Sequence, residues 1–528
     1  MTTDQPRTTL TATSTSAVTA TSPTSTPTGP TGPTAWTSAM ADRAAGALTG
    51  MACGDALGAP FEFGPPLSAD HPVAMTGGGG FGWEPGEWTD DTQMAVVILQ
   101  AAERAVGDGT RLTDHLDAVV QGWVDWAATA TDVGNQTRAV LGEVRRGGQA
   151  TAEDAAEAAD RFHTRTGRSG GNGSLMRTAP VALAFLDDEQ AMADAARAIS
   201  ELTHTDRDAG DACVLWCSAI RHAVLTAEFD LRHGLRLLPA DRRDLWVARI
   251  EEAQRSAPAD FDRNGWVVHA LQGAWSAITG TPVPDGGHLD HQPGDHLRLA
   301  LEAAVRGGRD TDTVAAIAGA LLGARWGSSA LPSSWRRVVH GWPGVGVTDL
   351  GLRGLAVAQR TPDGAWPLTD RKDYAHLGVP TSMVVHPHDL GVILGNAAVL
   401  DDLPDAIDAV VSLCRVGRRR PTHVQSADHV VVWLVDKDDP AENLNLDLAM
   451  REAADAVAAL RAEGRTVLLH CAAGQSRTPA VAAAYAVRHL GMDPVIALDE
   501  VCAALPSPAP KSALRAAVTR MTPTGTRH

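Results

Sequence analysis

Apolar residues recur every three to four positions through most of the first two-thirds of the chain. This spacing places them on one face of an α-helix and therefore predicts helical structure. Convincing runs of alternating apolar and polar residues, which are typical of half-buried strands, are absent from this region. We therefore expect an all-α domain at residues 39–358. The predicted helices lie at residues 92–106, 113–129, 151–160, 190–202, 207–228, 240–256, 296–306 and 314–326.

The pattern changes after residue 385. Short, continuously apolar segments rich in β-branched residues alternate there with segments of helical spacing. Strands buried on both faces of a parallel sheet have this composition, and their alternation with helices is typical of an α/β fold. We expect an α/β domain at residues 386–525, after a Pro- and Gly-containing linker at 359–385. The predicted strands lie at 392–394, 409–413, 430–435 and 466–469, and the helices at 441–463, 478–489 and 495–504.

Composition narrows the function classes. Residues 1–38 are mostly Thr, Ser, Ala and Pro, which bury too little apolar surface to fold, so we predict a disordered tail. The formal net charge of −18 disfavours nonspecific nucleic-acid binding. No apolar run reaches the ~18–20 residues of a membrane helix, so we expect no membrane partner. The six cysteines lack the spacing of a disulfide framework, which indicates a reduced, cytoplasmic compartment.

Two acidic motifs begin helical stretches that are far apart in the chain. They read Thr89-Asp90-Asp91-Thr92 and Asp310-Thr311-Asp312-Thr313. Crowded carboxylates repel one another unless cations neutralise them. With Glu62 as a further carboxylate and no His or Cys, an all-oxygen set favours Mg²⁺ or Mn²⁺ over zinc. Two such ions about 3.5–4 Å apart could activate a water and hold a diol. The alternative is that each motif is only a helix N-cap, although one motif can do both.

A glycine-containing segment and a histidine are candidates for substrate binding. The segment comprises Gly171, Asn172, Gly173 and Ser174. It precedes an apolar helical run, so its backbone N–H groups could bind a pyrophosphate. His204 lies at a predicted helix end. The alternatives are an ordinary loop and a structural histidine.

Four segments together resemble the ADP-ribosylglycohydrolase family, in the order in which the family has them. They read Gly54-Asp55-Ala56-Leu57-Gly58-Ala59-Pro60-Phe61-Glu62, Trp88-Thr89-Asp90-Asp91-Thr92, Gly171-Asn172-Gly173-Ser174-Leu175-Met176-Arg177 and Asp310-Thr311-Asp312-Thr313-Val314-Ala315-Ala316. The resemblance implies an all-α fold with two Mg²⁺ or Mn²⁺ ions that hydrolyses the bond joining ADP-ribose to a protein side chain or small molecule. The implied ligands are Thr89, Asp90, Asp91, Asp310, Asp312 and Thr313. Glu62 and Asp91 are the predicted catalytic carboxylates, and Glu62 is alternatively a further ligand.

The chain departs from this family pattern at Arg309, where the family usually has glycine. A long cation beside the metals could contact a substrate phosphate or narrow the pocket. This departure supports an alternative function, in which the first domain only binds ADP-ribose or a nucleotide and regulates the second domain.

The second domain contains a separate candidate site at Cys471 and Arg477, which five residues separate. These five are Ala472, Ala473, Gly474, Gln475 and Ser476. A predicted strand leads in and a helix leads out, so backbone N–H groups of the loop could bind a phosphate and lower the thiol pKa. Arg477 could contact the same phosphate with two donors.

This loop resembles that of the dual-specificity branch of the protein tyrosine phosphatases. It reads His470-Cys471-Ala472-Ala473-Gly474-Gln475-Ser476-Arg477-Thr478. The resemblance implies a phosphorylated substrate, Cys471 as the nucleophile and an aspartate on a mobile loop as the general acid. Asp436, Asp438 and Asp439 lie in the right segment, and we favour Asp438. The alternative is an acidic solvated loop without a catalytic role.

Overall fold

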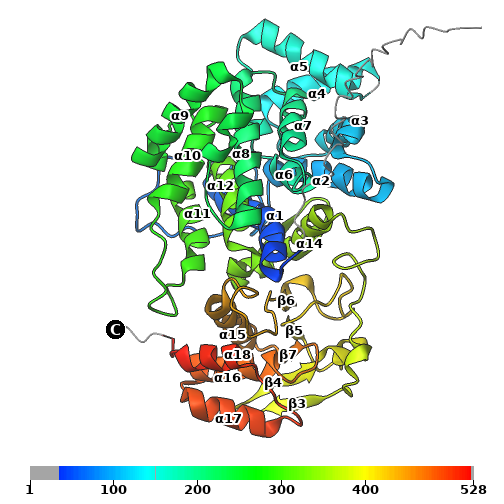
Figure 1. The fold of residues 1–528 in the computed structure, drawn as a ribbon, viewed down its shortest axis with the longest axis vertical. Helices are drawn as coiled ribbons and strands as arrows, with labels where there is room; N and C mark the ends of the chain where they lie inside the picture. Colours follow the sequence, from blue (N-terminus) through cyan, green and yellow to red (C-terminus); the bar gives the residue numbers. More distant parts are fainter. Residues whose placement is uncertain (1–34, 149, 525–528) are drawn as a thin grey trace, which may run out of the picture.

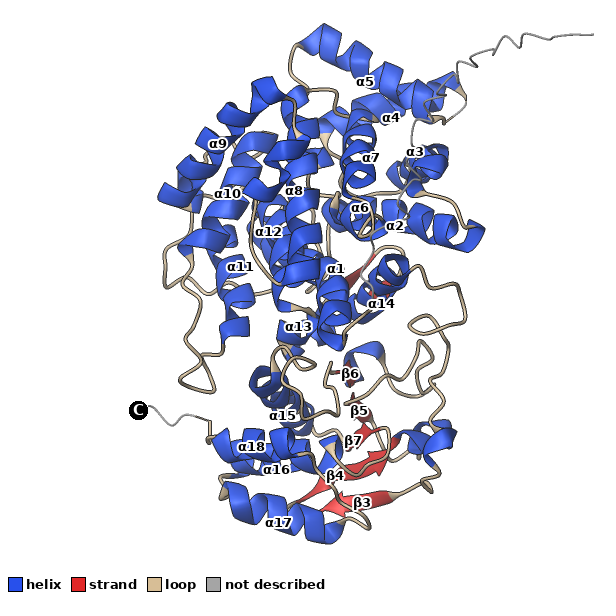
Figure 2. Ribbon diagram, viewed as in Figure 1, coloured by secondary structure: helices blue, strands red, loops and turns tan. Residues whose placement is uncertain are grey.

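The computed structural model describes residues 35–148 and 150–524 and consists of a helical unit followed by an α/β unit (Figures 1 and 2). Both predicted fold classes are confirmed. The helices of the first unit are α1 (Ser38–Gly58), α2 (Asp90–Asp108), α3 (Leu116–Ala127), α4 (Asn135–Gly147), α5 (Ala152–Thr166), α6 (Ala179–Ala184), α7 (Glu189–Glu201), α8 (Arg207–Thr226), α9 (Ala240–Arg255), α10 (Val267–Gly280), α11 (His296–Arg306), α12 (Thr311–Trp326), α13 (Ser333–Val338) and α14 (Val347–Gln359). Short strands β1 (His340–Gly341) and β2 (Val345–Gly346), which the pattern did not predict, form an antiparallel pair.

Helices α1 and α12 lie against each other at the centre of the first unit (Figure 1). Glycines on α1 recur every fourth residue and therefore lie along one face of the helix. They are Gly46, Gly50, Gly54 and Gly58. A Cβ atom at Gly54 would lie 2.0 Å from the carbonyl oxygen of Ala315, and one at Gly58 would lie 2.4 Å from the Cα of Asp312. The glycines thus let the two backbones touch, and this contact brings the end of α1 to the start of α12.

The second unit contains a five-stranded sheet in the order β3-β4-β7-β5-β6. Its elements are β3 (Met383–His386), β4 (Asp389–Asn396), β5 (Ala409–Ser412), β6 (His429–Val431), β7 (Val467–Cys471), α15 (Leu446–Ala462), α16 (Arg477–Leu490), α17 (Pro494–Ala504) and α18 (Ser512–Arg520). β3 pairs antiparallel with β4, and the other neighbours are parallel. β3 begins inside the segment predicted as a linker, so the end of that segment belongs to the sheet.

Both faces of the inner strands β5 and β7 are buried, which explains their continuously apolar sequences. Val467 and Leu469 pack in one hydrophobic cluster with residues of α15 and α16, while Leu468 between them packs in a second cluster with Val410 and Ile407. The predicted strand at 430–435 ends earlier, at Val431. Beyond it the chain runs as an extended segment toward the first unit.

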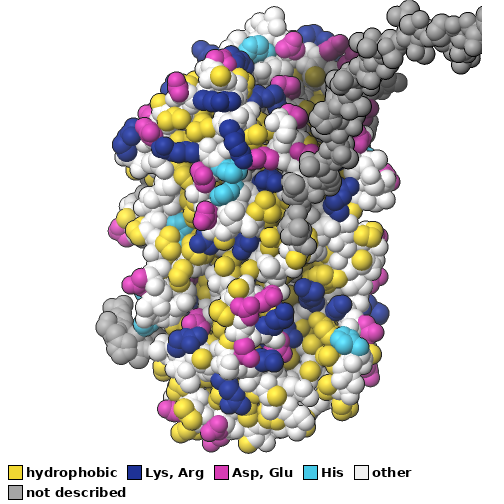
Figure 3. Space-filling model, viewed as in Figure 1, with side chains coloured by type: hydrophobic (Ala, Val, Ile, Leu, Met, Phe, Trp, Pro, Cys, Tyr) yellow, Lys and Arg dark blue, Asp and Glu magenta, His cyan; other side chains and the backbone are white. Residues whose placement is uncertain are grey.

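Other sequence expectations have mixed outcomes. The predicted disordered tail lies mostly outside the described residues, and α1 begins at Ser38. In the described part of the chain, no helix has both the length and the apolar character needed to cross a membrane. All six cysteines are free. Acidic and basic side chains are intermixed over the face shown in Figure 3. The cytoplasmic location stays a prediction.

Candidate active sites of the two units

The acidic motifs meet beside a cavity of about 450 Å³ in the first unit. Two groups of carboxylates have oxygen atoms within 4.8 Å of one another, and they share Asp312. One group is Asp55, Asp91 and Asp312, and the other is Glu62, Asp310 and Asp312. The structure therefore brings together four predicted residues from the two helix starts and from the segment after α1. Within the described residues, Asp90 belongs to neither group but lines the cavity, as does Thr313.

Burial and mutual repulsion disfavour the charged state of these carboxylates. Burial raises the pKa of Asp90, Asp91 and Asp312 well above the usual range, and neighbouring carboxylates raise these pKa values further. Burial, followed by the charge of Asp310, raises the pKa of Glu62 to about 9. Such a cluster is stable in its charged form when a cation neutralises it.

The donor set fits hard divalent cations. Asp91 Oδ1 and Glu62 Oε2 are buried, and neither has a hydrogen-bond partner within residues 35–148 and 150–524. Buried oxygens without partners are costly, so each is available to a ligand. Every ligand candidate in the two groups is a carboxylate, which suits Mg²⁺ or Mn²⁺ better than zinc. The residues present therefore fit two metal ions around Asp312.

Asp55 is a site residue to which the sequence analysis assigned no role, although it lies in a quoted motif. Its carboxylate accepts hydrogen bonds from Thr89 N (2.9 Å) and Thr92 N (3.0 Å), and so caps the first turn of α2. Thr89 Oγ1 in turn donates to Asp91 Oδ2 at 2.9 Å. Asp55 thus orients Asp91 as well as contributing an oxygen to the cluster.

The predicted glycine segment forms a short 3-10 turn, η3 (Asn172–Ser174), rather than the start of a long helix. Asn172 Nδ2 donates to Asp310 Oδ2 at 2.8 Å and so holds that carboxylate. Gly171, Asn172 and Gly173 line the cavity, but Ser174 is buried beneath it and contacts Cys213. The prediction that Ser174 reaches the substrate therefore finds no support in the geometry.

His204 lies against this glycine segment. A Cβ atom at Gly171 would lie 3.2 Å from its Nε2 atom, so glycine leaves room for the ring. Its Nδ1 lies 2.7 Å from Thr203 Oγ1, and burial holds its pKa well below the usual range. His204 is therefore a neutral part of the cavity wall.

Arg309 does not point into the cavity. Its backbone has a φ of 67°, a conformation that glycine adopts without strain, and this explains why the family has glycine here. Its side chain is directed toward the carbonyl oxygens of Ala259 and Gly307. Arg309 is not among the residues that line the cavity, so the geometry supports neither contact with a substrate phosphate nor narrowing of the pocket. The alternative of a purely binding domain gains no support from this residue.

The sequence analysis assigned no role to several residues that line the cavity, among them a carboxylate and an aromatic residue. Asp132 is a further carboxylate whose pKa is raised by burial, and Phe63 is 69% exposed with its ring 6.2 Å from that of Phe81. Neither lies in a motif, and only the path of the chain brings them to the cavity. Asn264, which donates to Gly308 O and accepts from Asp310 N, was missed for the same reason.

In the second unit, Cys471 ends β7 and Arg477 begins α16. Cys471 is 1% exposed, and Gly474 in the loop has a φ of 74°. Arg477 Nη1 donates to the carbonyl oxygens of Leu413 (2.7 Å) and Leu434 (3.0 Å). Its Nε lies 3.9 Å from Asp436 Oδ2 and has no hydrogen-bond partner among the described residues. The arginine is thus held by the sheet with a donor still free for an anion.

Two candidate acids near this loop differ in their surroundings. Ser476 Oγ donates to Asp436 Oδ1 at 2.5 Å, so Asp436 touches the loop. Asp438 instead accepts from Ala513 N (3.1 Å) and Ser512 Oγ (2.9 Å) at the start of α18. These hydrogen bonds lower the pKa of Asp438 below the usual range, which disfavours the protonated form that an acid needs.

The helical fold with its buried carboxylate cluster and the α/β fold with its cysteine loop define a two-unit protein of the hydrolase type. The ADP-ribosylglycohydrolase family model matches residues 37–366, and the model of the dual specificity phosphatase catalytic domain matches residues 404–515. The chain belongs to the ADP-ribosylglycohydrolase family, and it carries a dual-specificity-phosphatase-like domain after it.

Individual relatives agree with both assignments. The chain is 28% identical over 309 residues to the ADP-ribosylarginine hydrolase Tri1 of Serratia proteamaculans, covering 56% of this chain and 74% of that protein. It is 30% identical over 302 residues to the protein of the same name from Pseudomonas putida, covering 56% and 73%. The dual specificity protein phosphatase 1 of Arabidopsis thaliana is 32% identical over 93 residues, covering 18% of this chain and 45% of that protein.

Proposed function

We propose that the first unit hydrolyses the glycosidic bond between ADP-ribose and an arginine side chain, and that it depends on Mg²⁺ or Mn²⁺. The observation that carries this proposal is the pair of carboxylate groups that share Asp312 beside the cavity. The names of the two bacterial relatives support arginine as the acceptor.

Divalent cations held by Asp91, Asp310, Asp312 and Glu62 would activate a water molecule and coordinate the ribose hydroxyls. The chain's own groups position this set. Asn172 orients Asp310, and the positively charged anomeric carbon of the transition state gains from the surrounding carboxylates. The backbone of the glycine segment is available to the pyrophosphate, and Phe63 offers a ring face for a base.

The test uses full-length protein and a peptide that carries ADP-ribosyl-arginine. We expect release of ADP-ribose with Mg²⁺ or Mn²⁺, loss of release with EDTA, and loss in Asp312→Asn. Asp70→Asn is the matched control, because Asp70 is exposed and does not line the cavity. Equal release by wild type and Asp312→Asn would contradict the proposal, as would no release with either metal.

For the second unit we propose hydrolysis of phosphate monoesters. The Cys471 thiolate attacks phosphorus and forms an S–P bond as the P–O bond to the leaving group breaks. An aspartate gives its proton to the leaving oxygen, and water then cleaves the S–P bond to release inorganic phosphate. We assign the acid to Asp436, because it touches the loop; Asp438 stays the prediction from the sequence.

The phosphatase test uses para-nitrophenyl phosphate. Cys471→Ser should abolish release of nitrophenol, while Cys502→Ser, in the same unit but near the end of α17, should retain it. Activity in Cys471→Ser equal to that of wild type would refute the assignment. Neither variant should change release of ADP-ribose.

A further inference from the structure

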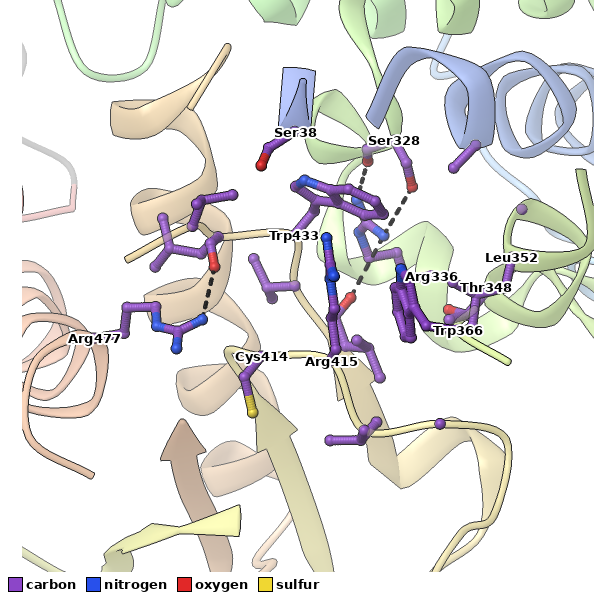
Figure 4. A pocket seen from close by; sticks show the side chains of 18 of the residues that line it. Ser38, Ser328, Arg336, Thr348, Leu352, Trp366, Cys414, Arg415, Trp433 and Arg477 are labelled. Atoms are coloured by element: carbon purple, nitrogen blue, oxygen red, sulfur yellow. Dashed lines mark hydrogen bonds between the residues drawn. The ribbon is translucent and has the colours of Figure 1, made fainter. Parts of the chain in front are cut away.

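A second cavity, of about 420 Å³, lies where the two units meet (Figure 4). The first unit contributes α1, α13 and α14 to its wall, including Arg336, Thr348 and Leu352. The second unit contributes the segments after β5 and β6 together with Arg477. Arg477 therefore belongs both to the cysteine loop and to this cavity, so whatever fills the cavity lies beside the phosphatase site.

Buried ion pairs and hydrogen bonds join the two units. Arg451 on α15 forms a buried ion pair with Asp295 of the first unit, with N–O distances of 2.9 and 2.7 Å. Glu452 accepts a hydrogen bond from Ser333 N at 2.7 Å. Buried charges need such partners, so the two units hold a defined relative position. The first unit therefore stays in place beside the phosphatase site and forms one side of it.

The cavity wall carries positive charge that the protein does not fully neutralise. Arg420 lies 3.7 Å from Asp349, and Lys437 lies 3.3 Å from a carboxylate outside the wall. Among the described residues, Arg415 has no carboxylate within 4.0 Å of its guanidinium nitrogens, and its guanidinium instead lies over a tryptophan ring. Arg336 donates to Ser328 and to the carbonyl oxygen of Val431, with Asp42 and Glu452 close enough to act on its charge. The wall carries more cations than carboxylates, the latter being Asp349 and Asp436, and this excess favours an anionic ligand.

Flat rings and unused donors also face this space. The Arg415 guanidinium lies over the ring of Trp366 at 4.6 Å, and Trp433 lines the same cavity (Figure 4). Trp433 Nε1 and Arg477 Nε are buried and have no hydrogen-bond partner in the described part of the chain, although the latter lies 3.9 Å from Asp436 Oδ2. Buried donors without acceptors are unfavourable, so a ligand with acceptor oxygens would satisfy them. Tryptophan faces and an arginine plane also stack well against a planar ring.

We propose that this cavity binds the leaving group of the phosphatase substrate, and that the substrate is a nucleotide-like small molecule: a phosphate monoester that carries a flat ring and a second anionic group. The inference rests on the proposed phosphatase function. The monoester phosphate would lie at Arg477, the ring near Trp433 and Trp366, and the second anion near Arg336 and Arg415. A phosphorylated protein fits less well, because α1 and α14 occupy one side of the approach.

The experiment compares substrates on the full-length protein. We measure kcat/KM for adenosine 3′,5′-bisphosphate, adenosine 5′-monophosphate, a phosphotyrosine peptide and para-nitrophenyl phosphate. We expect the bisphosphate to exceed the peptide by about 100-fold, because unmatched donors in a site reject ligands that lack the acceptors. A peptide that matches or exceeds the bisphosphate would overturn the inference.

Two variants test the cavity from opposite walls. Leu352→Trp fills it from the first unit, and Arg415→Leu removes a cation from the second. Each should raise KM for the bisphosphate about tenfold or more while kcat for para-nitrophenyl phosphate stays within about twofold. The matched controls are Leu245→Trp, on exposed α9, and Arg419→Leu, which does not line the cavity. Unchanged KM in both Leu352→Trp and Arg415→Leu would overturn the inference.

Failure of the proposed phosphatase function has a different signature, because wild type would then leave para-nitrophenyl phosphate intact. In that case calorimetry tests the cavity, with adenosine 3′,5′-bisphosphate titrated into the full-length protein, and the Arg415 and Arg419 variants separate this cavity from the site of the first unit. Binding that Arg415→Leu weakens and Arg419→Leu preserves would support the cavity assignment. Absence of binding would overturn it.

Discussion

Gly58→Ala tests how helix packing builds the metal site. Gly58 ends α1, and its added Cβ would lie 2.4 Å from both the Cα and the N of Asp312. These are backbone atoms, so no side-chain rotation relieves the contact. Asp312 belongs to both carboxylate groups, and Asp55 lies one turn before Gly58. The substitution therefore pushes apart two parts of the predicted metal site.

The size of the displacement follows from the geometry. Ordinary van der Waals contact begins near 3.4 Å, so the two backbones must separate by about 1 Å. Misplacement of catalytic groups by 1 Å costs about 100-fold in rate. Overpacking a close-packed contact costs about 1–3 kcal/mol of unfolding free energy. We expect both effects in Gly58→Ala.

The assay measures ADP-ribose release from the arginine-linked substrate, Mn²⁺ affinity by paramagnetic resonance titration, and stability by denaturant unfolding. Gly107→Ala is the matched control, because Gly107 lies within α2 and its Cβ would meet no atom within 4 Å. This control should keep full activity and gain up to about 1 kcal/mol, since alanine favours helix. Wild-type rate and Mn²⁺ affinity in Gly58→Ala would refute the reasoning.

Four further predictions concern other residues. Asp55→Ala removes the cap of α2 and should weaken Mn²⁺ binding about 10–100-fold in the same titration, as loss of an orienting partner does; unchanged affinity would contradict its role. Asp436→Ala should lower kcat on phenyl phosphate about 10²–10⁴-fold, and Asp438→Ala should lower it much less. A larger loss in Asp438→Ala would instead identify Asp438 as the general acid. Burial lowers the pKa of His470 to about 4 in the folded protein, from about 6.5 in the unfolded chain. As the pH falls below 6.5 the unfolded chain therefore binds a proton that the folded protein does not, and the free energy of unfolding should be about 2 kcal/mol lower at pH 5 than above pH 6.5. Denaturant titrations should show this decrease in wild type and not in His470→Gln. Arg451→Met leaves a buried carboxylate unpaired and should cost about 3–5 kcal/mol at the contact between the units, visible as two separated calorimetric transitions instead of one.

Much of the fold was predictable because it depends on local pattern. Helical spacing located α7 and α8 to within two residues, and continuous β-branched runs located β5 and β7. Other elements were not delimited, for physical reasons. Ala-rich helical patterning begins near Ala39, but α1 is rich in alanine and glycine and is buried on nearly all sides, so no polar face marks its bounds. β3 is mostly exposed along an edge of the sheet, where apolar character is not required.

The sequence by itself determined the chemistry of both sites: carboxylates at two helix starts, and a cysteine and an arginine five residues apart between a strand and a helix. Spacing within one element is a local property, and hydrogen bonding within that element enforces it. Only the tertiary structure decided that Asp55 caps α2 beside Asp91 and that Arg309 turns away from the cavity. The tertiary structure also decided that residues of the first unit line the cavity beside Arg477. These relations join residues that are far apart in the chain, 34 positions for Asp55 and Thr89 and 50 for Arg309 and Ala259, and close packing of complementary surfaces, rather than any periodicity, brings them together.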